Sequence, residues 1–310
     1  MSITVQAEPK KQHRSLSDKK LEAITGYLFI LPTVLGFVVF TLGPIIATFY
    51  FSLTKYNMLK PPQYIGIENY VDMLADLRLL EVSRNTMVFS VSAVSLTIVF
   101  GLLMAVALNQ NLLLPSFIQN IFRSVYFFPI LVAMIYVAMI WQFWFHKDLG
   151  VINYYLGLLH IEPIRWLGSS QWALVSIIIV YVWKNVGFSM LIFLTGLQNI
   201  NKDYYEAAEL DGAGSLQKFF GITLPLLSPT LLFTMIINSI NAFQEFDSMI
   251  VLTGGGPGDA SRSLVLYIYE KAFRSFDMGY ASALAMVLFL VIMILTLVQL
   301  KLSQKWVHYE

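Results

Sequence analysis

Six long apolar runs are the feature of this sequence that most restricts its fold. Each run has few charged residues and reaches the length of about 20 residues that a helix needs to cross a bilayer. Inside lipid the backbone must satisfy its own hydrogen bonds, so helices are the expected form. We therefore predict an all-α membrane protein with six transmembrane helices. The predicted spans are residues 26–53, 86–108, 121–144, 172–197, 229–252 and 280–300.

The composition agrees with a membrane protein and excludes several functions. The chain of 310 residues is 57% hydrophobic and 13% charged, whereas soluble domains carry about 25% charged residues. A net charge of +1 gives no reason to expect nucleic acid as a partner. The absence of cysteine excludes disulfides, thiol catalysis and cysteine metal sites, and the histidines are too isolated to suggest another metal site.

The orientation of the spans follows from the amino-terminal residues. Residues 1–25 are polar and carry five Lys or Arg residues, which favours a cytoplasmic tail by the positive-inside rule. The remaining loops carry more basic residues on the predicted outer side, but the first segment usually dominates. We therefore predict a cytoplasmic tail (1–25), a six-helix membrane domain (26–300) with a cytoplasmic loop at 198–228, and a cytoplasmic carboxyl-terminal tail (301–310).

The sequence of the loop at 198–228 predicts a folded segment of two short helices separated by a glycine. Asp203 is expected to cap a short helix whose third residue is Glu206, as in a capping box. Gly212 is expected to end that helix, because glycine adopts left-handed conformations at little cost. Ser215 is then expected to cap a second helix that stops near Pro225. An ordinary solvated loop with common caps would show the same pattern.

The spacing within this loop adds a resemblance to a known family. Glu206-Ala207-Ala208 is followed by Gly six residues after the Glu, by Ile222 ten residues further, and by Leu-Pro at 224–225. This pattern resembles the signature of permease subunits of binding-protein-dependent ABC importers. Other segments are similar to the carbohydrate-uptake branch of that family, and the likeness covers the chain from the first span to the last. These segments are Gly-Ile-Glu-Asn-Tyr at 66–70, Arg-Asn-Thr at 84–86, Leu-Thr-Gly-Gly-Gly-Pro-Gly at 252–258 and Gly-Tyr-Ala-Ser-Ala at 279–283.

The resemblance implies a fold, a mechanism and partners. The fold would be that of a type I ABC importer permease in the cytoplasmic membrane of a bacterium or archaeon. The helix beginning near Asp203 would insert into a cleft on a cytoplasmic ATPase. The implied partners are a second homologous but non-identical permease, two ATPase subunits, an external solute-binding protein and a carbohydrate. The residues assigned to ATPase coupling are Asp203, Glu206, Ala207, Ala208, Asp211, Gly212, Ile222, Leu224 and Pro225.

The chain is not expected to be an enzyme. It lacks a Gly-x-x-x-x-Gly-Lys-Ser/Thr phosphate-binding sequence, so ATP and Mg²⁺ would be bound by the partner ATPases and no cofactor by this chain. It also lacks the motifs of intramembrane hydrolases and di-metal enzymes.

Polar residues inside the spans are candidates for the substrate path, because they are costly in lipid. In the fifth span Asn238, Asn241 and Glu245 share one helix face. In the fourth span Lys184 is a possible partner of Glu245. Hydrogen bonding between helices is the alternative role for the residues of the fifth span. In the fourth span the alternative is a helix break that satisfies its own backbone through Asn185. The substrate-path candidates are Asn238, Asn241, Gln244, Glu245, Lys184 and Asn185.

Two other transport functions remain open at this point. An importer of glycerol 3-phosphate or a polyol phosphate shares the same signature, but a phosphate favours Arg or Lys in the cavity. The fifth span has no basic residue, which favours a neutral carbohydrate, whereas Lys184 in the fourth span weakens that argument. An ATP-independent channel or secondary transporter would not need the docking loop around Glu206.

Overall fold

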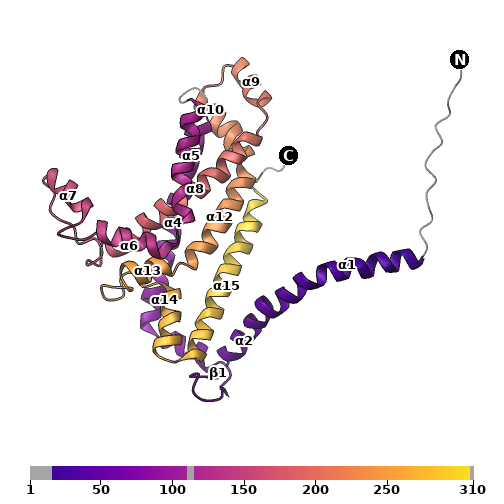
Figure 1. Ribbon diagram of the computed structural model, residues 1–310, viewed down its shortest axis with the longest axis vertical. Coiled ribbons are helices and arrows are strands. Elements are labelled where there is room, and N and C mark those ends of the chain that lie inside the picture. Colours follow the sequence, from indigo (N-terminus) through magenta and orange to yellow (C-terminus); the bar gives the residue numbers. More distant parts are fainter. Residues whose placement is uncertain (1–15, 110–114, 308–310) are drawn as a thin grey trace. The chain divides into compact units, whose positions relative to one another are not determined.

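The computed structural model of this protein describes residues 16–109 and 115–307 (Figure 1). Residues 1–15 of the predicted cytoplasmic tail, residues 110–114 and the last three residues of the chain lie outside the described residues. The chain forms two units, which divide between Tyr50 and Phe51. Each unit is described by itself.

The first unit is helical from its first described residue. It contains α1 (Leu16–Phe37), a π-helical turn η1 (Val38–Leu42) and most of α2 (Gly43–Ser52). The helical stretch Lys20–Ser52 is long and apolar enough to cross a membrane. Helix α1 begins ten residues before the predicted span, because the polar stretch at 16–25 is rich in the helix formers Leu, Lys, Glu and Ala.

The second unit is a helical bundle with a short antiparallel strand pair, in which Thr54 lies opposite Tyr64 and Lys55 opposite Gln63. Figure 1 places α9 and α10 at one end of this unit and α14 and β1 at the other. We call these the α9 end and the α14 end. Its elements are β1 (Thr54–Lys55), β2 (Gln63–Tyr64), α3 (Glu68–Ala75), α4 (Leu77–Asn109), α5 (Ser116–Leu131), α6 (Met134–Trp144), α7 (Val151–Leu158), α8 (Ala173–Asn199), α9 (Asp203–Leu210), α10 (Ser215–Lys218), η2 (Phe219–Thr223), α11 (Leu224–Leu226), α12 (Ser228–Phe243), α13 (Asp247–Leu252), α14 (Leu264–Tyr269), η3 (Glu270–Arg274) and α15 (Met278–Ser303).

The described residues confirm the all-α membrane fold and correct two of the spans. Four helices are long and apolar enough to cross a membrane, and six spans result if each of two bent helix pairs counts as one. The predicted third span is bent by 102° between Leu131 and Met134. The break follows Pro129, which cannot donate a backbone hydrogen bond in a helix.

The predicted fifth span is also not one helix. Helix α12 ends at Phe243, and a separate helix, α13, begins at Asp247. The polar stretch between them interrupts the apolar run, and the Glu245 carboxylate accepts the backbone N–H of Ser248 in α13 at 2.9 Å. This bond satisfies one of the amides that the start of a new helix leaves free.

Small residues allow the helices of the bundle to pack closely. A Cβ atom on Gly187 of α8 would lie 1.8 Å from the carbonyl oxygen of Tyr126 in α5. A Cβ atom on Gly101 of α4 would lie 2.9 Å from Cβ of Ser189 in α8. Close backbone approach of this kind is a common way for helices to associate in membranes.

Candidate functional site

The loop between α8 and α12 begins with an exposed helix, α9. The Asn201 side-chain oxygen accepts the backbone N–H of Asp203 at 3.1 Å, and the Asn201 amide donates to the Asp203 carboxylate at 3.0 Å. The prediction that Asp203 caps this helix is therefore wrong. Asp203 is the first residue of α9, and its carboxylate lies in the first turn, where negative charge is favourable.

Gly212 ends α9 as predicted. Its φ angle is +78°, in the left-handed region. The backbone N–H of Gly212 bonds to the Glu209 carbonyl at 3.0 Å, and that of Ala213 bonds to the Ala208 carbonyl at 2.9 Å. These two bonds form a Schellman motif, which closes the carboxyl end of the helix.

The second half of the loop leads directly into α12. The Gln217 side chain accepts the backbone N–H of Gly214 at 2.8 Å, so Gly214 precedes α10 and Ser215 is its first residue rather than its cap. A π-helical turn, η2, and the short helix α11 follow. Pro225 and Pro229 lie in the first turns of α11 and α12, where a missing N–H costs little. The whole segment bends by 65° at the start of α12.

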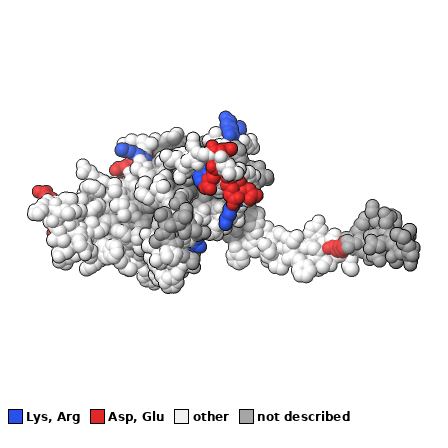
Figure 2. Space-filling view, turned by 90° about the horizontal axis from the view of Figure 1, so that it is seen from above, with Lys and Arg blue, Asp and Glu red and all other residues white. Residues whose placement is uncertain are grey.

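The loop presents an exposed surface of mixed chemistry. None of the α9 residues is buried, and Glu206 and Ala207 are exposed. Three apolar side chains of the loop are largely exposed: Leu210 at 91%, Leu216 at 74% and Phe220 at 63%. Figure 2 shows acidic side chains gathered in one patch on the face that carries α9. Exposed apolar side chains rimmed by charge are typical of protein interaction sites.

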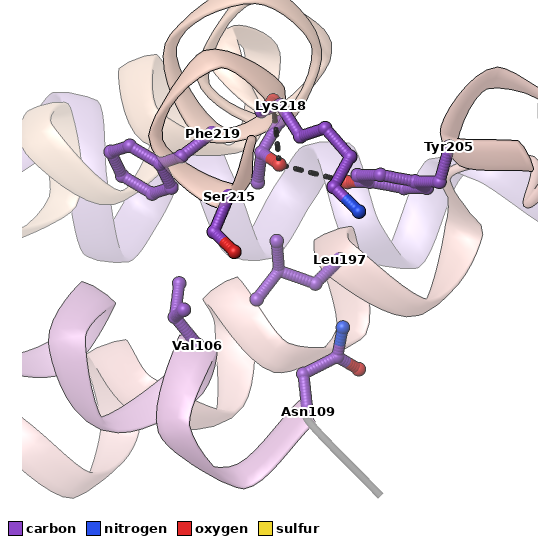
Figure 3. Close-up of a pocket in the computed structure, with 8 residues that line it drawn as sticks. Val106, Asn109, Leu197, Tyr205, Ser215, Lys218 and Phe219 are labelled. Carbon is purple, nitrogen blue, oxygen red and sulfur yellow. Dashed lines mark hydrogen bonds between the residues drawn. The ribbon is translucent and has the colours of Figure 1, made fainter. Parts of the chain in front are cut away.

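The loop is also held to the bundle by side chains. The hydroxyl oxygens of Tyr205 and Thr223 lie 2.9 Å apart, and the Lys218 ammonium lies 2.6 Å from the Glu209 carboxylate. Ile222 and Leu224, which flank Thr223, are half-buried. A cavity of about 350 Å³ lies between the loop and the ends of α4 and α8 (Figure 3). It is lined by Val106, Asn109, Leu197, Tyr205, Ser215, Lys218, Phe219 and Thr223.

Two of the substrate-path candidates, Asn238 and Asn185, donate hydrogen bonds inside the bundle. Asn238 is 4% exposed and donates to the Ser189 hydroxyl in α8 at 3.1 Å and to the Thr234 carbonyl at 2.8 Å. Asn185 donates to the Tyr181 carbonyl of its own helix at 2.8 Å. Asn238 thus has the alternative role of hydrogen bonding between helices. The helix break predicted as the alternative at Asn185 is wrong, because α8 continues unbroken from Ala173 to Asn199.

Three candidates lie where α12 ends. Asn241 and Gln244 are exposed on the second unit. Glu245 lies beyond the last residue of α12, so the predicted shared helix face with Asn238 is wrong. The Glu245 carboxylate accepts both the backbone N–H and the hydroxyl of Ser248, at 2.9 and 2.6 Å. Its first role in the structure is to hold the start of α13.

Lys184 does not form the predicted ion pair with Glu245; no such pair lies within 4.0 Å in the part of the chain that the structure describes. Its ammonium donates to the Ile130 carbonyl at 3.3 Å. Ile130 lies in the last turn of α5, where carbonyls lack helical partners and the helix dipole favours a cation. The bend in the third span therefore supplies the partner of Lys184.

A network at the α14 end was missed by the sequence reasoning. The Asp259 carboxylate accepts two bonds from the Arg78 guanidinium, at 2.6 and 2.8 Å, and one from Arg262 at 2.5 Å. These bonds, led by those from Arg78, lower the pKa of Asp259 to about 2. Asn85 donates to the Asp259 carbonyl at 2.6 Å. Arg78 and Asn85 lie more than 170 residues from Asp259 in the sequence, and no local pattern reveals such pairs.

A second carboxylate, that of Asp76, joins the same end of the bundle. It accepts the hydroxyls of Tyr267 and Tyr280 at 2.6 and 2.7 Å. Burial raises the pKa of Asp76, but the two hydroxyl bonds, the bond from the Leu79 backbone N–H and the charge of Lys271 together hold the pKa below its usual value. Four segments lie at or beside these contacts: 66–70, 84–86, 252–258 and 279–283. They are the segments that resemble the carbohydrate-uptake branch, so stretches far apart in the sequence come together at the α14 end.

Comparisons with known proteins identify relatives over nearly the whole chain. Residues 97–308 match the family described as "Binding-protein-dependent transport system inner membrane component". The chain is 36% identical to the probable ABC transporter permease protein YesP of Bacillus subtilis, over 98% of this chain and 97% of that protein. It is 36% identical to the trehalose/maltose transport system permease protein MalF of Thermococcus litoralis, over 92% of this chain and 96% of that protein.

A solved structure has the same fold. A chain of the bacterial alginate ABC transporter, in complex with an alginate pentasaccharide-bound periplasmic protein, superposes with a TM-score of 0.83 at 21% identity. The match covers 94% of this chain and 98% of that chain.

Proposed function

This chain belongs to the family of binding-protein-dependent transport system inner membrane components, and from that membership we propose that it is the permease subunit of an ATP-driven carbohydrate importer. The observation that carries the proposal is the loop between α8 and α12, which begins with the exposed, Schellman-terminated helix α9 and bears the complete spaced family pattern at residues 206–225. A trehalose/maltose permease among the relatives and the alginate transporter among the similar structures support a carbohydrate, delivered by an external solute-binding protein.

We propose that the exposed surface of the loop docks on an ATPase subunit. Glu206 and Ala207 would face the partner's cleft, and Leu210 would insert its exposed apolar side chain. The complete importer would hold this chain, a second homologous permease, two ATPases and the external binding protein. ATP and Mg²⁺ would be bound by the ATPases alone.

The proposal requires the α9 end to face the cytoplasm, with both chain termini on that side. Because the chain has no cysteine, single cysteines give unique labels. In vesicles that hold this chain without the ATPase, which would cover this position, a cysteine at Leu210 (91% exposed) should react with an impermeant maleimide only when the vesicles are inside-out. A cysteine at Leu59 (81% exposed), near the opposite end, should react only in right-side-out vesicles. The reverse pattern would refute this orientation.

A neutral carbohydrate remains the preferred substrate over a polyol phosphate. The one basic group considered for the path, Lys184, already bonds to the Ile130 carbonyl. Asn241 and Gln244, exposed at the end of α12, offer amide donors and acceptors that suit sugar hydroxyls. We propose these two residues and Glu245 as substrate contacts, with Asn238 and Asn185 holding the bundle.

The test is co-purification of the tagged full-length chain from a gently solubilised native membrane. Recovery of an ATPase, a second permease and a solute-binding protein is expected, whereas repeated recovery of this chain alone would contradict the proposal. The binding protein is then screened by thermal shift with trehalose, maltose, maltotriose, arabinotriose and glycerol 3-phosphate. Stabilisation by glycerol 3-phosphate alone would replace the carbohydrate proposal.

Two substitutions test the docking surface directly. Glu206→Lys reverses the charge on the exposed face of α9, and Gly212→Pro removes the left-handed residue that ends the helix. Both should leave the protein in the membrane and abolish recovery of the ATPase. Glu68→Lys, the same charge change at an exposed position of α3, is the control and should retain the ATPase. Normal recovery with Glu206→Lys would remove this surface from the docking site.

A further inference from the structure

Along the chain, helix α9 is joined to α12 through residues 211–214, which contain two glycines, and then through α10, η2 and α11. Residues 211–214 read Asp-Gly-Ala-Gly, and Gly212 has the left-handed φ angle of +78°. Glycine has more conformational freedom than any other residue, so a pull on α9 would readily deform this connection. A contact other than the chain itself is needed to carry a movement of α9 into the fifth span.

The hydroxyl pair of Tyr205 and Thr223 supplies such a contact. Figure 3 shows the Tyr205 ring reaching from α9 towards the loop, with its hydroxyl in the bond of 2.9 Å. Tyr205 is half-buried and packs against the apolar cluster that contains Leu197 and Leu227. Most of the other α9 side chains are exposed. Tyr205 therefore belongs to the face of α9 that points away from the proposed docking surface.

Thr223 lies where a movement of α9 can be transmitted to α12. It is 7% exposed and is the last residue of the π-helical turn η2, which continues through α11 into α12. Its hydroxyl oxygen also lies 3.4 Å from the Lys218 carbonyl, which can only accept a hydrogen bond. If the single hydroxyl proton of Thr223 goes to that carbonyl, Tyr205 is the donor to Thr223. Short π-helical turns of this kind often occur at functional sites.

The second link between the two halves of the loop is weaker. The ion pair of Lys218 and Glu209 is short, at 2.6 Å, but the Glu209 side chain is 65% exposed. Exposed ion pairs contribute little because solvent screens them. The partly buried hydroxyl bond therefore dominates the connection.

We propose that Tyr205 is a positioning residue that braces α9 against Thr223, so that α9, η2 and the start of α12 move as one body when an ATPase pulls on α9. This inference rests on the proposed docking of α9. Without the hydroxyl bond, docking should persist, but communication across the permease should weaken. Loss of the brace thus affects communication across the permease, whereas loss of the docking surface affects binding of the ATPase.

The test uses the assembled complex in proteoliposomes, with Tyr205→Phe and Thr223→Val as near-isosteric removals of each hydroxyl. Recovery of the ATPase and basal ATP hydrolysis should be unchanged. Stimulation of hydrolysis by the binding protein, loaded with the sugar that stabilises it, should fall about two- to tenfold, as expected for one net hydrogen bond. The double variant should match either single variant, and Thr223→Ser should retain stimulation. Thr234→Val, which removes a buried hydroxyl in α12 that bonds to the Thr230 carbonyl, is the matched control.

The outcomes separate this inference from the proposed function. If Glu206→Lys keeps the ATPase and its stimulation, docking through α9 is wrong. If Glu206→Lys loses the ATPase while Tyr205→Phe and Thr223→Val are stimulated normally, only the brace is refuted. Additive effects in the double variant, or failure of both single variants to assemble, would also overturn it, because the bond would then serve folding rather than communication.

Discussion

The close packing of α5 on α8 makes a specific prediction for Gly187→Ala. The added Cβ atom would lie 1.8 Å from the Tyr126 carbonyl oxygen, whereas real Cβ contacts shorter than 3.0 Å are essentially never seen. The two backbones must therefore separate by at least 1.2 Å. No side-chain rotation relieves this clash, because the backbone fixes the position of the Cβ atom and its partner is a backbone carbonyl oxygen.

The cost follows from the rigidity of the contact. Overpacking a well-packed interior costs about 1–3 kcal/mol, and a backbone clash belongs at the upper end of that range. A loss of about 3 kcal/mol changes the unfolding equilibrium by roughly 100-fold. It should lower the thermal midpoint by about 6–12 °C, on the scale of a large domain. The Lys184 bond to Ile130, on neighbouring turns of the same two helices, should weaken as well.

The assay is thermal unfolding of the full-length chain in lipid nanodiscs, with two other glycines as a graded series. At Gly101 a Cβ atom would lie 2.9 Å from the Cβ atom of Ser189, so Gly101→Ala should have an intermediate effect. At Gly157 in α7 a Cβ atom meets nothing within 4 Å, so Gly157→Ala should be neutral or slightly stabilising. A midpoint for Gly187→Ala close to that of the parent protein would refute the reasoning.

Two further predictions concern carboxylates. The native pKa of Asp259, about 2, lies below its ordinary value of 3.8, so its bonds stabilise the fold above pH 3.8 and this contribution is lost as the pH falls towards 2. The thermal midpoint of Asp259→Asn should therefore lie below that of the parent by a constant amount near neutral pH, and this gap should close in acid; a gap that widens would contradict the assignment. Glu245→Ala should lower uptake of the identified sugar more than it lowers assembly of the complex. Glu245→Gln removes the charge but keeps a side-chain oxygen that accepts from Ser248, so its comparison with Glu245→Ala separates the effect of the charge from the effect of losing support for α13. Unchanged uptake kinetics in both variants would remove Glu245 from the substrate path.

Local patterns predicted the features of this chain that depend on local physics. The apolar runs marked the membrane helices, because crossing a bilayer needs a continuous apolar length. Gly212 marked the end of α9, because the left-handed turn there favours glycine. The caps were less well predicted. Asn201 and Gln217 accept backbone N–H groups at the starts of these two helices, where Asp203 and Ser215 were expected to act, because each helix start leaves several N–H groups free.

Features that depend on distant contacts were not predicted. The apolar stretch through the third span continues past Pro129, so its composition did not reveal a bend of 102°. Once that bend exposes the Ile130 carbonyl, Lys184 gains a partner that no count of charged residues would suggest. Arg78 and Asp259 likewise meet only in the folded bundle.

The two ends of the second unit are held together in different ways, and the difference bears on where movement occurs. At the α14 end, Asp259 receives two parallel bonds from Arg78 and a third from Arg262, and Asp76 receives two hydroxyls. Charge-assisted and bidentate bonds are roughly twice as strong as neutral ones. At the α9 end, the side-chain bonds between α9 and the segment from α10 to α11 are, among the described residues, one neutral hydroxyl pair and one solvated ion pair, beside the apolar packing of Tyr205. Because fewer and weaker bonds hold the α9 end, loss of one of them changes its attachment more. The hydroxyl bond of Tyr205 should therefore affect the transmission of movement more than any single bond of the network at the α14 end.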